Sequence, residues 1–486
     1  MRLRELLSAL PGAEAARSAA DPEVRRVVHD SREVAPGDVF VAIRGEKADG
    51  LAHVPEALAR CAVAVVAETP PPPAPAVPWV RVESARRALA LLAAKLAGNP
   101  AEKLVLAGVT GTNGKTTTAV LLQSLLAKRH GSAGFLGTIG YRIGAREVPA
   151  DRTTPDAAVL QRLLAEIVRE GIAAASMEVS SHALALDRVE GCRFDLTVFT
   201  NLTRDHLDFH RDMEAYGAAK RRLFALRKPG AAAVVNAGDP FGRRLAEEVG
   251  GRVVTFASGP TADVTAESIH CDLSGTSFEA VFGGGRFRVA SPLLGRFNVD
   301  NLLAAAAGGL ALGMAPPDIA AGLAAVTRVP GRLEPVAAGQ PYAILVDYAH
   351  TEDALERLLR AVRELTDRKI ILVFGCGGDR DRGKRRPMGR IAGSLADIAI
   401  ATSDNPRSED PEAILSEVEE GLVASGATKY LRLADRYQAL RAAIELANPG
   451  TVVVIAGKGH ETTQVIGDKA EPFDDRAIAA ELASRR

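Results

Sequence analysis

The segment Val109-Thr110-Gly111-Thr112-Asn113-Gly114-Lys115-Thr116-Thr117 decides the fold class of this protein. The apolar run 104–107 before it predicts a strand, and the pattern of 116–129 after it predicts a helix. A glycine-rich turn between a strand and a helix lets backbone N–H groups converge on phosphate oxygens. Lys115 would reach the β- and γ-phosphates, and the Thr116 hydroxyl would bind Mg²⁺. The segment predicts a nucleoside triphosphate site, although Val109 replaces the first glycine of the strict motif.

Strands and helices alternate on both sides of this loop. Apolar runs predict further strands at 39–43, 62–66, 173–177, 196–200, 232–236, 253–256, 343–346, 370–374, 398–402 and 452–456. Such alternation is typical of mostly parallel sheets covered by helices. A helix over 84–97 ends at Gly98-Asn99-Pro100, where we place a boundary. We therefore predict an α/β protein of three domains: a small N-terminal α/β domain (1–99), a central P-loop parallel-sheet domain (100–330) and a C-terminal Rossmann-like α/β domain (331–486).

Composition restricts the partners of the chain. Its 486 residues include 60 basic and 60 acidic ones, so net charge gives no global attraction to nucleic acid or anionic lipid. The four cysteines lack metal-binding spacing and favour a reducing, cytoplasmic setting. Residues 1–8 predict an amphipathic helix and not a signal peptide, and 302–315 is too short and glycine-interrupted to span a bilayer. We expect a cytoplasmic monomer with small-molecule substrates, no nucleic acid partner and no membrane insertion.

Four more segments, with the loop GTNGKTT, resemble the Mur ligase family over the whole chain. They are Met177-Glu178-Val179-Ser180-Ser181-His182, Thr200-Asn201-Leu202-Thr203-Arg204-Asp205-His206-Leu207-Asp208, Asp347-Tyr348-Ala349-His350 and Asp404-Asn405-Pro406-Arg407. The resemblance implies an ATP-dependent ligase that adds meso-2,6-diaminopimelate to UDP-N-acetylmuramoyl-L-alanyl-D-glutamate in peptidoglycan precursor synthesis. ATP would phosphorylate a carboxylate of the nucleotide-linked peptide, and the incoming amine would attack the resulting acyl phosphate.

The same resemblance implies a catalytic centre of Lys115, Glu178, His206 and Lys220. Two Mg²⁺ ions would be held by Thr116, Glu178, His206 and Lys220. From chemistry alone, a carboxylate after a strand suits Mg²⁺, whereas a loop histidine is more often a hydrogen-bonding residue. Lys220, beside Arg221 and Arg222, would by itself indicate a solvated helix face. The family pattern implies instead that CO₂ carbamylates Lys220, giving an anion able to bind the second Mg²⁺, and the two arginines could offset its charge.

The resemblance also assigns the remaining nucleotide contacts and the acceptor site. ATP would be bound by Gly111, Thr112, Asn113, Gly114, Lys115, Thr116, Thr117, Asn298, Asn301, Arg332, Asp347 and His350. The UDP-linked dipeptide would be bound by Ser31, Glu46, Lys47, Ala48, Thr153, Thr154, Ser180 and Arg188. Hydroxyls and a guanidinium are suitable donors to carboxylate and phosphate oxygens. Leu186 and Arg152 stand where some members have Gln and Asn, so one or two acceptor hydrogen bonds are expected to differ here.

The loops after three predicted strands carry the charges that diaminopimelate requires. Arg380 and Arg407 can each pair bidentately with its distal carboxylate, and Glu461 can accept from an ammonium. Surface ion pairing is the alternative role for these arginines. The full set of predicted amine-binding residues is Arg380, Asp404, Asn405, Pro406, Arg407, Gly457 and Glu461.

Three other functions stay open at this point. A lysine-adding relative would lack Asn405-Pro406-Arg407, and a folylpolyglutamate synthase would lack the N-terminal domain that carries Asp30-Ser31-Arg32. A nucleotide-dependent switch would keep the phosphate loop without needing Arg380, Arg407 and Glu461 together. Ligase turnover releases ADP only when the UDP-linked dipeptide and an amino acid are both present, which separates a ligase from a switch.

Overall fold

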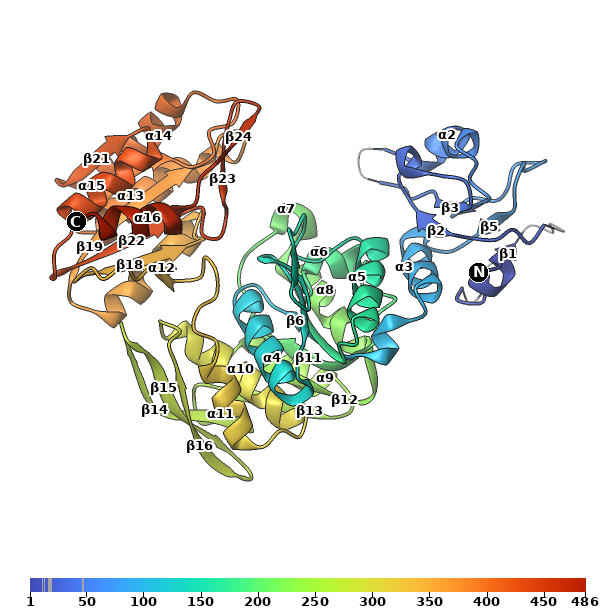
Figure 1. The fold of residues 1–486 in the computed structure, drawn as a ribbon, viewed down its shortest axis with the longest axis horizontal. Helices are drawn as coiled ribbons and strands as arrows, with labels where there is room; N and C mark the ends of the chain where they lie inside the picture. Colours follow the sequence, from blue (N-terminus) through green and yellow to red (C-terminus); the bar gives the residue numbers. More distant parts are fainter. Residues whose placement is uncertain (11, 13, 16–19, 46–47) are drawn as a thin grey trace. The chain divides into compact units, whose positions relative to one another are not determined.

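A computed structural model describes residues 1–10, 12, 14–15, 20–45 and 48–486 (Figure 1). The predicted acceptor contacts Glu46 and Lys47 lie outside the described residues. The chain forms two compact units, one of residues 1–265 and 302–322 and the other of residues 266–301 and 323–486. The boundary predicted after residue 99 therefore falls inside the first unit, and 266–301 groups with the C-terminal part of the chain.

The N-terminal part of the first unit contains a sheet of strand order β1-β5-β4-β3-β2, parallel except for β1. Its elements are α1 (Leu3–Leu7), β1 (Glu14–Ala15), β2 (Arg26–Val28), β3 (Asp38–Val41), α2 (Val54–Ala59), β4 (Ala64–Ala67), β5 (Trp79–Arg81) and α3 (Ala85–Leu96). The Ser84 hydroxyl caps α3 by accepting from Arg87 N–H at 3.2 Å. Apolar residues of α3 pack on this sheet, with Leu89 and Val39 among the buried ones.

The rest of the first unit is built on parallel strands in the order β13-β12-β11-β6-β10-β7. These strands are β6 (Val105–Thr110), β7 (Gly134–Gly137), β10 (Ala174–Glu178), β11 (Phe194–Phe199), β12 (Arg227–Asn236) and β13 (Val253–Ala257), with antiparallel β8 (Gly140–Ile143) and β9 (Arg146–Val148) beyond β7. In this register Val109 lies opposite both Glu178 and Val198. The carboxyl ends of β6, β10 and β11 consequently share one sheet edge, where open α/β sheets bind ligands.

Helices flank these strands. They are α4 (Lys115–His130), α5 (Ala157–Arg169), α6 (Ser181–Ala185), α7 (Leu207–His210), α8 (Met213–Ala225), α9 (Pro240–Glu248), α10 (Phe297–Ala311) and α11 (Pro316–Ala324). Strand β14 (Val264–Asp272) pairs with β13 and is followed by the antiparallel hairpin of β15 (Gly275–Phe282) and β16 (Gly285–Ser291).

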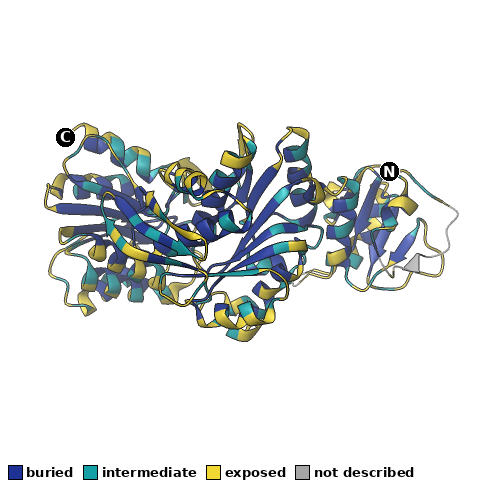
Figure 2. Cartoon of the chain, turned by 90° about the horizontal axis from the view of Figure 1, so that it is seen from below, coloured by how far each residue is buried: buried dark blue, intermediate teal, exposed yellow. Residues whose placement is uncertain are grey.

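The C-terminal part of the second unit has the strand order β17-β18-β22-β19-β20-β21, parallel except for β17. Its elements are β17 (Glu334–Pro335), β18 (Ala343–Asp347), α12 (Glu352–Leu365), β19 (Lys369–Cys376), α13 (Arg385–Leu395), β20 (Ile398–Ser403), α14 (Pro411–Ala424), β21 (Tyr430–Leu433), α15 (Arg436–Leu446), β22 (Thr451–Ala456), β23 (Thr463–Ile466), β24 (Lys469–Pro472) and α16 (Asp475–Ser484). Along β22, Val452 and Val454 face α12, α13 and α14, whereas Val453 and Ile455 face α15 and α16. Both faces are buried, which explains the unbroken apolar strand sequence (Figure 2).

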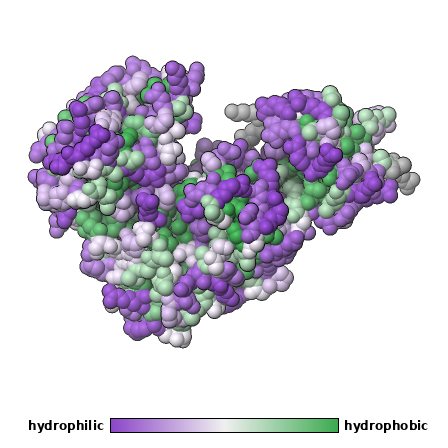
Figure 3. Space-filling view, viewed as in Figure 1, coloured by the Kyte–Doolittle hydropathy of each residue, from purple (hydrophilic) through white to green (hydrophobic). Residues whose placement is uncertain are grey.

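The α/β class is confirmed, and the predicted strands are present with ends that differ by a few residues. The β15–β16 and β23–β24 hairpins were not predicted. Helix α10 begins at Phe297, so Asn298 and Asn301 lie among its first five residues. In the part of the chain that the structure describes, no helix is both long and apolar enough to cross a membrane. On the face seen in Figure 3, hydrophilic side chains cover much of the surface, with smaller apolar areas among them.

Candidate active site

The predicted phosphate loop, residues 111–114, follows β6 and leads into α4. Gly111 has φ 151°, and a Cβ there would lie 1.9 Å from the Thr200 hydroxyl, so only glycine fits. The adjacent loop after β11 holds the turn: Thr112 N–H donates to Asn201 O at 2.8 Å, and Asn113 N–H donates to Asn201 Oδ1 at 2.9 Å. The phosphate loop is therefore positioned by the neighbouring strand end.

Two lysine side chains converge on one carbonyl of this loop. Lys115 Nζ donates to Gly111 O at 3.0 Å and to Thr112 O at 2.8 Å, and Lys220 Nζ donates to Gly111 O at 2.7 Å. Lys220 is 1% exposed, and its Nζ lies 4.2 Å from the centre of the Tyr216 ring. Burial, reinforced by Lys115, holds the pKa of Lys220 well below its ordinary value of 10.5. The solvated-face alternative for Lys220 is therefore wrong.

The two arginines after Lys220 point to other partners. Arg221 pairs with Glu248 at 2.8 Å, and Arg222 pairs with Asp187 and Glu190. The suggestion that they offset a negative charge on Lys220 is thus not supported by their contacts, since α8 turns their side chains away from its buried face.

Glu178 is the last residue of β10 and only 1% exposed. Its Oε2 accepts from the Thr116 hydroxyl at 2.9 Å, and its Oε1 accepts from Thr138 N–H at 2.7 Å. Glu178 makes no ion pair with any residue the structure describes. A buried carboxylate beside a hydroxyl, with no cation of its own, fits a hard divalent ion such as Mg²⁺. Within residues 1–10, 12, 14–15, 20–45 and 48–486, no three His, Cys, Asp or Glu side chains form a metal cluster, so other ligands would complete such a site.

Three histidine rings lie near the phosphate loop. The His182 ring centre is 4.7 Å from that of His206 and 5.5 Å from that of His210, and His210 Nε2 lies 2.9 Å from the Ser181 hydroxyl. Burial lowers the pKa of all three, for His182 to about 4. They are therefore neutral at pH 7, with ring nitrogens able to accept. No described contact joins His206 to Glu178, and the sequence-based site prediction omitted His182 and His210.

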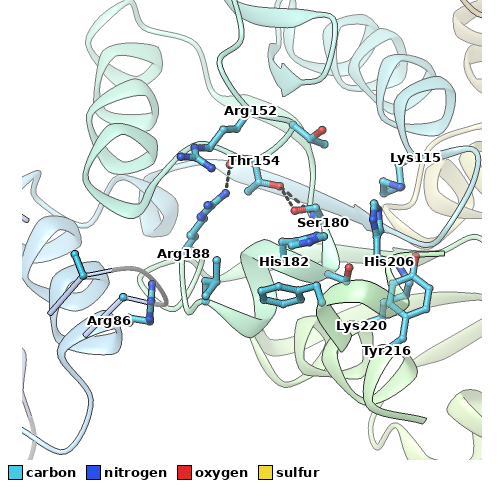
Figure 4. A pocket seen from close by; sticks show the side chains of 16 residues that line it. Arg86, Lys115, Arg152, Thr154, Ser180, His182, Arg188, His206, Tyr216 and Lys220 are labelled. Atoms are coloured by element: carbon cyan, nitrogen blue, oxygen red, sulfur yellow. Dashed lines mark hydrogen bonds between the residues drawn. The ribbon is translucent and has the colours of Figure 1, made fainter. Parts of the chain in front are cut away.

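A cavity of about 690 Å³ in the first unit joins the phosphate loop to predicted acceptor residues (Figure 4). Its lining is Gly45, Ala48, Arg86, Lys115, Arg152, Thr153, Thr154, Ser180, Ser181, His182, Leu186, Arg188, His206, Phe209, Tyr216 and Lys220. Lysine and arginine side chains line it, whereas none of these lining residues is acidic. Arg188 Nε pairs with Asp156 at 3.0 Å, and its Nη1 donates to Thr154 O at 3.2 Å. The cavity fits a ligand with several negative charges.

Ser31 and Arg152 differ in their position relative to this cavity. Ser31 is not among the lining residues, and its hydroxyl donates to Glu56 Oε2 at 2.7 Å. Arg152, which departs from the family pattern, lines the cavity and lies 3.5 Å from Asp156. Arg86, from α3, also lines it and was not predicted.

In the second unit, the predicted nucleotide contacts Arg332, Asp347 and His350 lie around the carboxyl end of β18, whereas Asn298 and Asn301 lie on α10. Asp347 Oδ2 accepts from Leu333 N–H at 2.7 Å, and burial raises its pKa. The Arg332 guanidinium carbon lies 5.5 Å from the Tyr348 ring centre, and His350 Nδ1 is 2.8 Å from Tyr348 O. Asn301 Nδ2 donates to Asn298 Oδ1 at 2.8 Å on α10.

The loops after β19, β20 and β22 bring the predicted amine-binding residues together. Asn405 Nδ2 donates to Glu461 Oε2 at 3.1 Å, and the Lys458 ammonium lies between Asn405, Glu461 and Asp404. Arg407 Nη1 donates to Gly378 O at 2.8 Å, and Arg407 makes no ion pair with a described carboxylate. Arg380 is exposed; its Nη1 donates to its neighbour's carbonyl, Asp379 O, at 3.4 Å. Neither Arg380 nor Arg407 therefore forms a surface ion pair among the described residues.

The loop of residues 404–407 is bonded to the β23–β24 hairpin, some sixty residues later in the chain. Gln464 Nε2 donates to Asp404 O at 2.7 Å, and Val465 N–H donates to Asn405 Oδ1 at 2.9 Å. Arg407 N–H donates to Val465 O at 3.1 Å, and Gly467 N–H donates to Arg407 O at 2.8 Å. These bonds hold Arg407 at φ 52°, a conformation that non-glycine residues rarely adopt.

Comparisons with known proteins identify the family of the chain. Family models match residues 23–96 (Mur ligase family, catalytic domain), 109–309 (Mur ligase middle domain) and 331–459 (Mur ligase, glutamate ligase domain). The UDP-N-acetylmuramoyl-L-alanyl-D-glutamate–2,6-diaminopimelate ligase of Solibacter usitatus is 46% identical over 486 residues, covering 99% of this chain and 98% of that protein. The chain therefore belongs to the Mur ligase family.

Solved structures agree with the fold. The structure of a UDP-N-acetylmuramoyl-L-alanyl-D-glutamate–2,6-diaminopimelate ligase matches with a TM-score of 0.74 and 33% identity, covering 100% of this chain and 99% of that one. The MurF ligase of Thermotoga maritima, solved with ADP, matches with a TM-score of 0.61 and 22% identity, covering 95% and 96% of the two chains. The three-domain α/β fold of the Mur ligases is thus the fold of this protein.

Proposed function

We propose that this protein is an ATP-dependent amide ligase that adds meso-2,6-diaminopimelate to UDP-N-acetylmuramoyl-L-alanyl-D-glutamate in peptidoglycan precursor synthesis. The observation that carries the proposal is the cavity of the first unit. It places the phosphate-loop lysine, Lys115, in one lining with the hydroxyls and guanidinium predicted to bind the acceptor, Thr153, Thr154, Ser180 and Arg188. A γ-phosphate and an acceptor carboxylate can meet there.

The reaction follows from positioning and charge. An oxygen of the acceptor carboxylate attacks the γ-phosphorus of ATP, and the bond from this phosphorus to the β-phosphate oxygen breaks. ADP departs, and the acceptor is then an acyl phosphate. The amine nitrogen then attacks the acyl carbon, loses a proton and expels phosphate as the amide forms. Lys115 stabilises the charge of the transferred phosphoryl group, and Arg188 orients the acceptor. Bound Mg²⁺, held by Thr116, Glu178, His206 and a carbamate of Lys220, would neutralise phosphate charge.

The carbamate is part of this proposal, and two Mg²⁺ ions are proposed with it. A lysine adds CO₂ only as the neutral amine: an N–C bond forms and one proton leaves. The burial of Lys220 and its nearness to Lys115 favour the neutral form. The test is ¹³C NMR of protein equilibrated with ¹³CO₂. A carbamate resonance that is present in the wild type and absent in Lys220→Met would support the carbamate, and a wild type without this resonance would exclude it.

Two sets of residues in the second unit would bind ATP and the amine. Arg332, Asp347 and His350, with Asn298 and Asn301, would contact the adenine or ribose. Arg380, Asp404, Asn405, Pro406, Arg407, Gly457 and Glu461 would bind diaminopimelate. Arg407 pairs with no carboxylate among the described residues, which supports a role with the distal carboxylate that lysine lacks.

We further propose a cytoplasmic monomer with a UDP-sugar-binding domain (1–99), an ATP-binding domain (100–330) and an amino-acid-binding domain (331–486). The family-model matches at 23–96, 109–309 and 331–459 each fall inside one of these ranges, which supports the boundaries. Sedimentation of the purified chain would test the monomer.

The testing experiment is ADP release with ATP, Mg²⁺ and the UDP-linked dipeptide, with meso-diaminopimelate, L-lysine or no amine. We expect turnover with diaminopimelate and little with lysine. Equal turnover with lysine would favour the lysine-adding alternative, and ADP release independent of both dipeptide and amine would favour the nucleotide switch.

A further inference from the structure

Lys458 is a fully buried lysine at the carboxyl end of β22 that the proposed mechanism does not use. Its side chain is 0% exposed and follows Gly457, whose φ is 117°. Its Nζ donates to Asn405 Oδ1 at 3.0 Å and to Glu461 Oε2 at 3.2 Å, and lies 3.7 Å from Asp404 Oδ1. A buried ammonium is stable only when it is paired, and here its partners are all predicted amine-binding residues.

These contacts determine which way the Asn405 amide points. An ammonium only donates hydrogen bonds, so Asn405 must turn Oδ1 toward Lys458. The same oxygen accepts from Val465 N–H at 2.9 Å. Asn405 Nδ2 is then directed at Glu461 Oε2, at 3.1 Å. Glu461 Oε2 thus receives two donors, which fixes the carboxylate and leaves Oε1 as the oxygen to meet a ligand.

The direct ion pairs of this cluster join two carboxylates to one ammonium group. Asp404 and Glu461 carry two negative charges, and Lys458 supplies one positive charge. A fully buried arginine that acts on the same carboxylates, Arg436, has a carboxylate partner of its own, because its Nε and Nη2 pair with Asp475 at 2.8 and 2.7 Å. Arg436 makes no direct ion pair with Asp404 or Glu461 among the described residues, although its charge still acts on both. By direct contact the two carboxylates therefore share one described cation, Lys458, and can accept a substrate ammonium as well.

We propose that Lys458 is a positioning residue for the amine substrate, acting through Asn405 and Glu461. It aligns the Glu461 carboxylate to accept from an ammonium group of the amino acid, and it is the described cation in direct contact with both carboxylates of the cluster. This inference rests on the proposed function, because it concerns the same amine site.

The test is steady-state kinetics of Lys458→Met, which keeps the length of the side chain and removes its charge and donors. We expect the KM for diaminopimelate to rise roughly 10- to 100-fold, since hydrogen bonds to charged groups are the strong ones. The KM values for ATP and for the UDP-linked dipeptide should stay within about twofold. Lys458→Arg keeps a cation and should recover part of the loss.

A double-mutant cycle with Glu461→Gln separates positioning from a structural role. If Lys458 acts through Glu461, Lys458→Met should add little to the effect of Glu461→Gln on the KM for diaminopimelate. The matched control is Val453→Ala, a buried truncation on the same strand, which should lower the Tm without a selective change in that KM.

Provided that the wild type turns over diaminopimelate, three results would overturn the inference. The first is an unchanged KM for diaminopimelate in Lys458→Met, and the second is additive effects of Lys458→Met and Glu461→Gln in the double mutant. The third is an equal change in all three KM values of Lys458→Met together with a lowered Tm. If Lys458→Met does not fold, a loss in folded Lys458→Arg that is additive with Glu461→Gln would overturn it. Absence of diaminopimelate-dependent ADP release by the wild type would instead refute the proposed function itself.

Discussion

Replacing Arg407 by alanine is expected to remove most of the preference for diaminopimelate over lysine. The guanidinium uses Nη1 for Gly378 O at 2.8 Å and makes no ion pair among the residues described, so its other nitrogens can bind a substrate carboxylate. A hydrogen bond to a charged group contributes about 1.5–3 kcal/mol. Arg407 is partly exposed, so for the bidentate pair we take about 2–3 kcal/mol after solvent screening.

That energy corresponds to a fall of roughly 30- to 150-fold in kcat/KM for diaminopimelate. Lysine has no distal carboxylate, so its kcat/KM should change by less than about threefold. The assay is ADP release with each amine at fixed ATP and dipeptide. Arg441→Ala is a suitable control, because this exposed arginine of α15 pairs with Glu445, four residues later, and with no other described carboxylate. An equal fall with both amines, or less than about fivefold with diaminopimelate in a folded variant, would refute the reasoning.

Three further predictions concern stability and nucleotide binding. Lys220→Met should raise the Tm at pH 7 in CO₂-free buffer. Because the pKa of Lys220 in the folded protein lies well below 10.5, the stability of the wild type rises with pH up to 10.5, and the Tm gain of the variant should shrink toward that pH. A Tm gain that stays constant with pH would contradict this. Asp475→Asn should cost about 3–5 kcal/mol in urea unfolding, because it leaves the buried Arg436 guanidinium unpaired, and a loss under about 1 kcal/mol would contradict it. Gly111→Ala should weaken ATP binding by more than about tenfold in calorimetry, since its Cβ would lie 1.9 Å from the Thr200 hydroxyl; unchanged affinity would show that the loop adapts.

The sequence predicted the parts of the fold that follow from simple periodicity. The strand before Gly111 and the helix after it were readable because apolar runs and a glycine-rich turn have few other interpretations. The β15–β16 hairpin was missed because its strands are half exposed and its turn, at Gly283 and Gly284, breaks no strong apolar run. Strand ends shifted because hydrogen-bond register, and not apolar content, decides where pairing stops.

The candidate site was less readable from chemistry alone. A signal for the burial of Lys220 was present, since Tyr216, Lys220 and Phe224 recur at helical spacing and form the buried face of α8. Adjacent arginines obscured it. Lys458 offered no such signal, because it stands between two glycines in a loop, and only the fold brings it to Asn405.

The bonding of residues 404–407 to the β23–β24 hairpin affects how substrate choice could be transplanted between ligases. Four backbone or amide hydrogen bonds cross between the loop and the hairpin, two of them at Arg407 itself. Grafting Asp404-Asn405-Pro406-Arg407 onto a relative would carry over the side chains but not these bonds. Each lost bond costs about 1 kcal/mol, and an arginine at φ 52° has no intrinsic reason to keep that conformation. The transferable module is therefore the loop together with its hairpin.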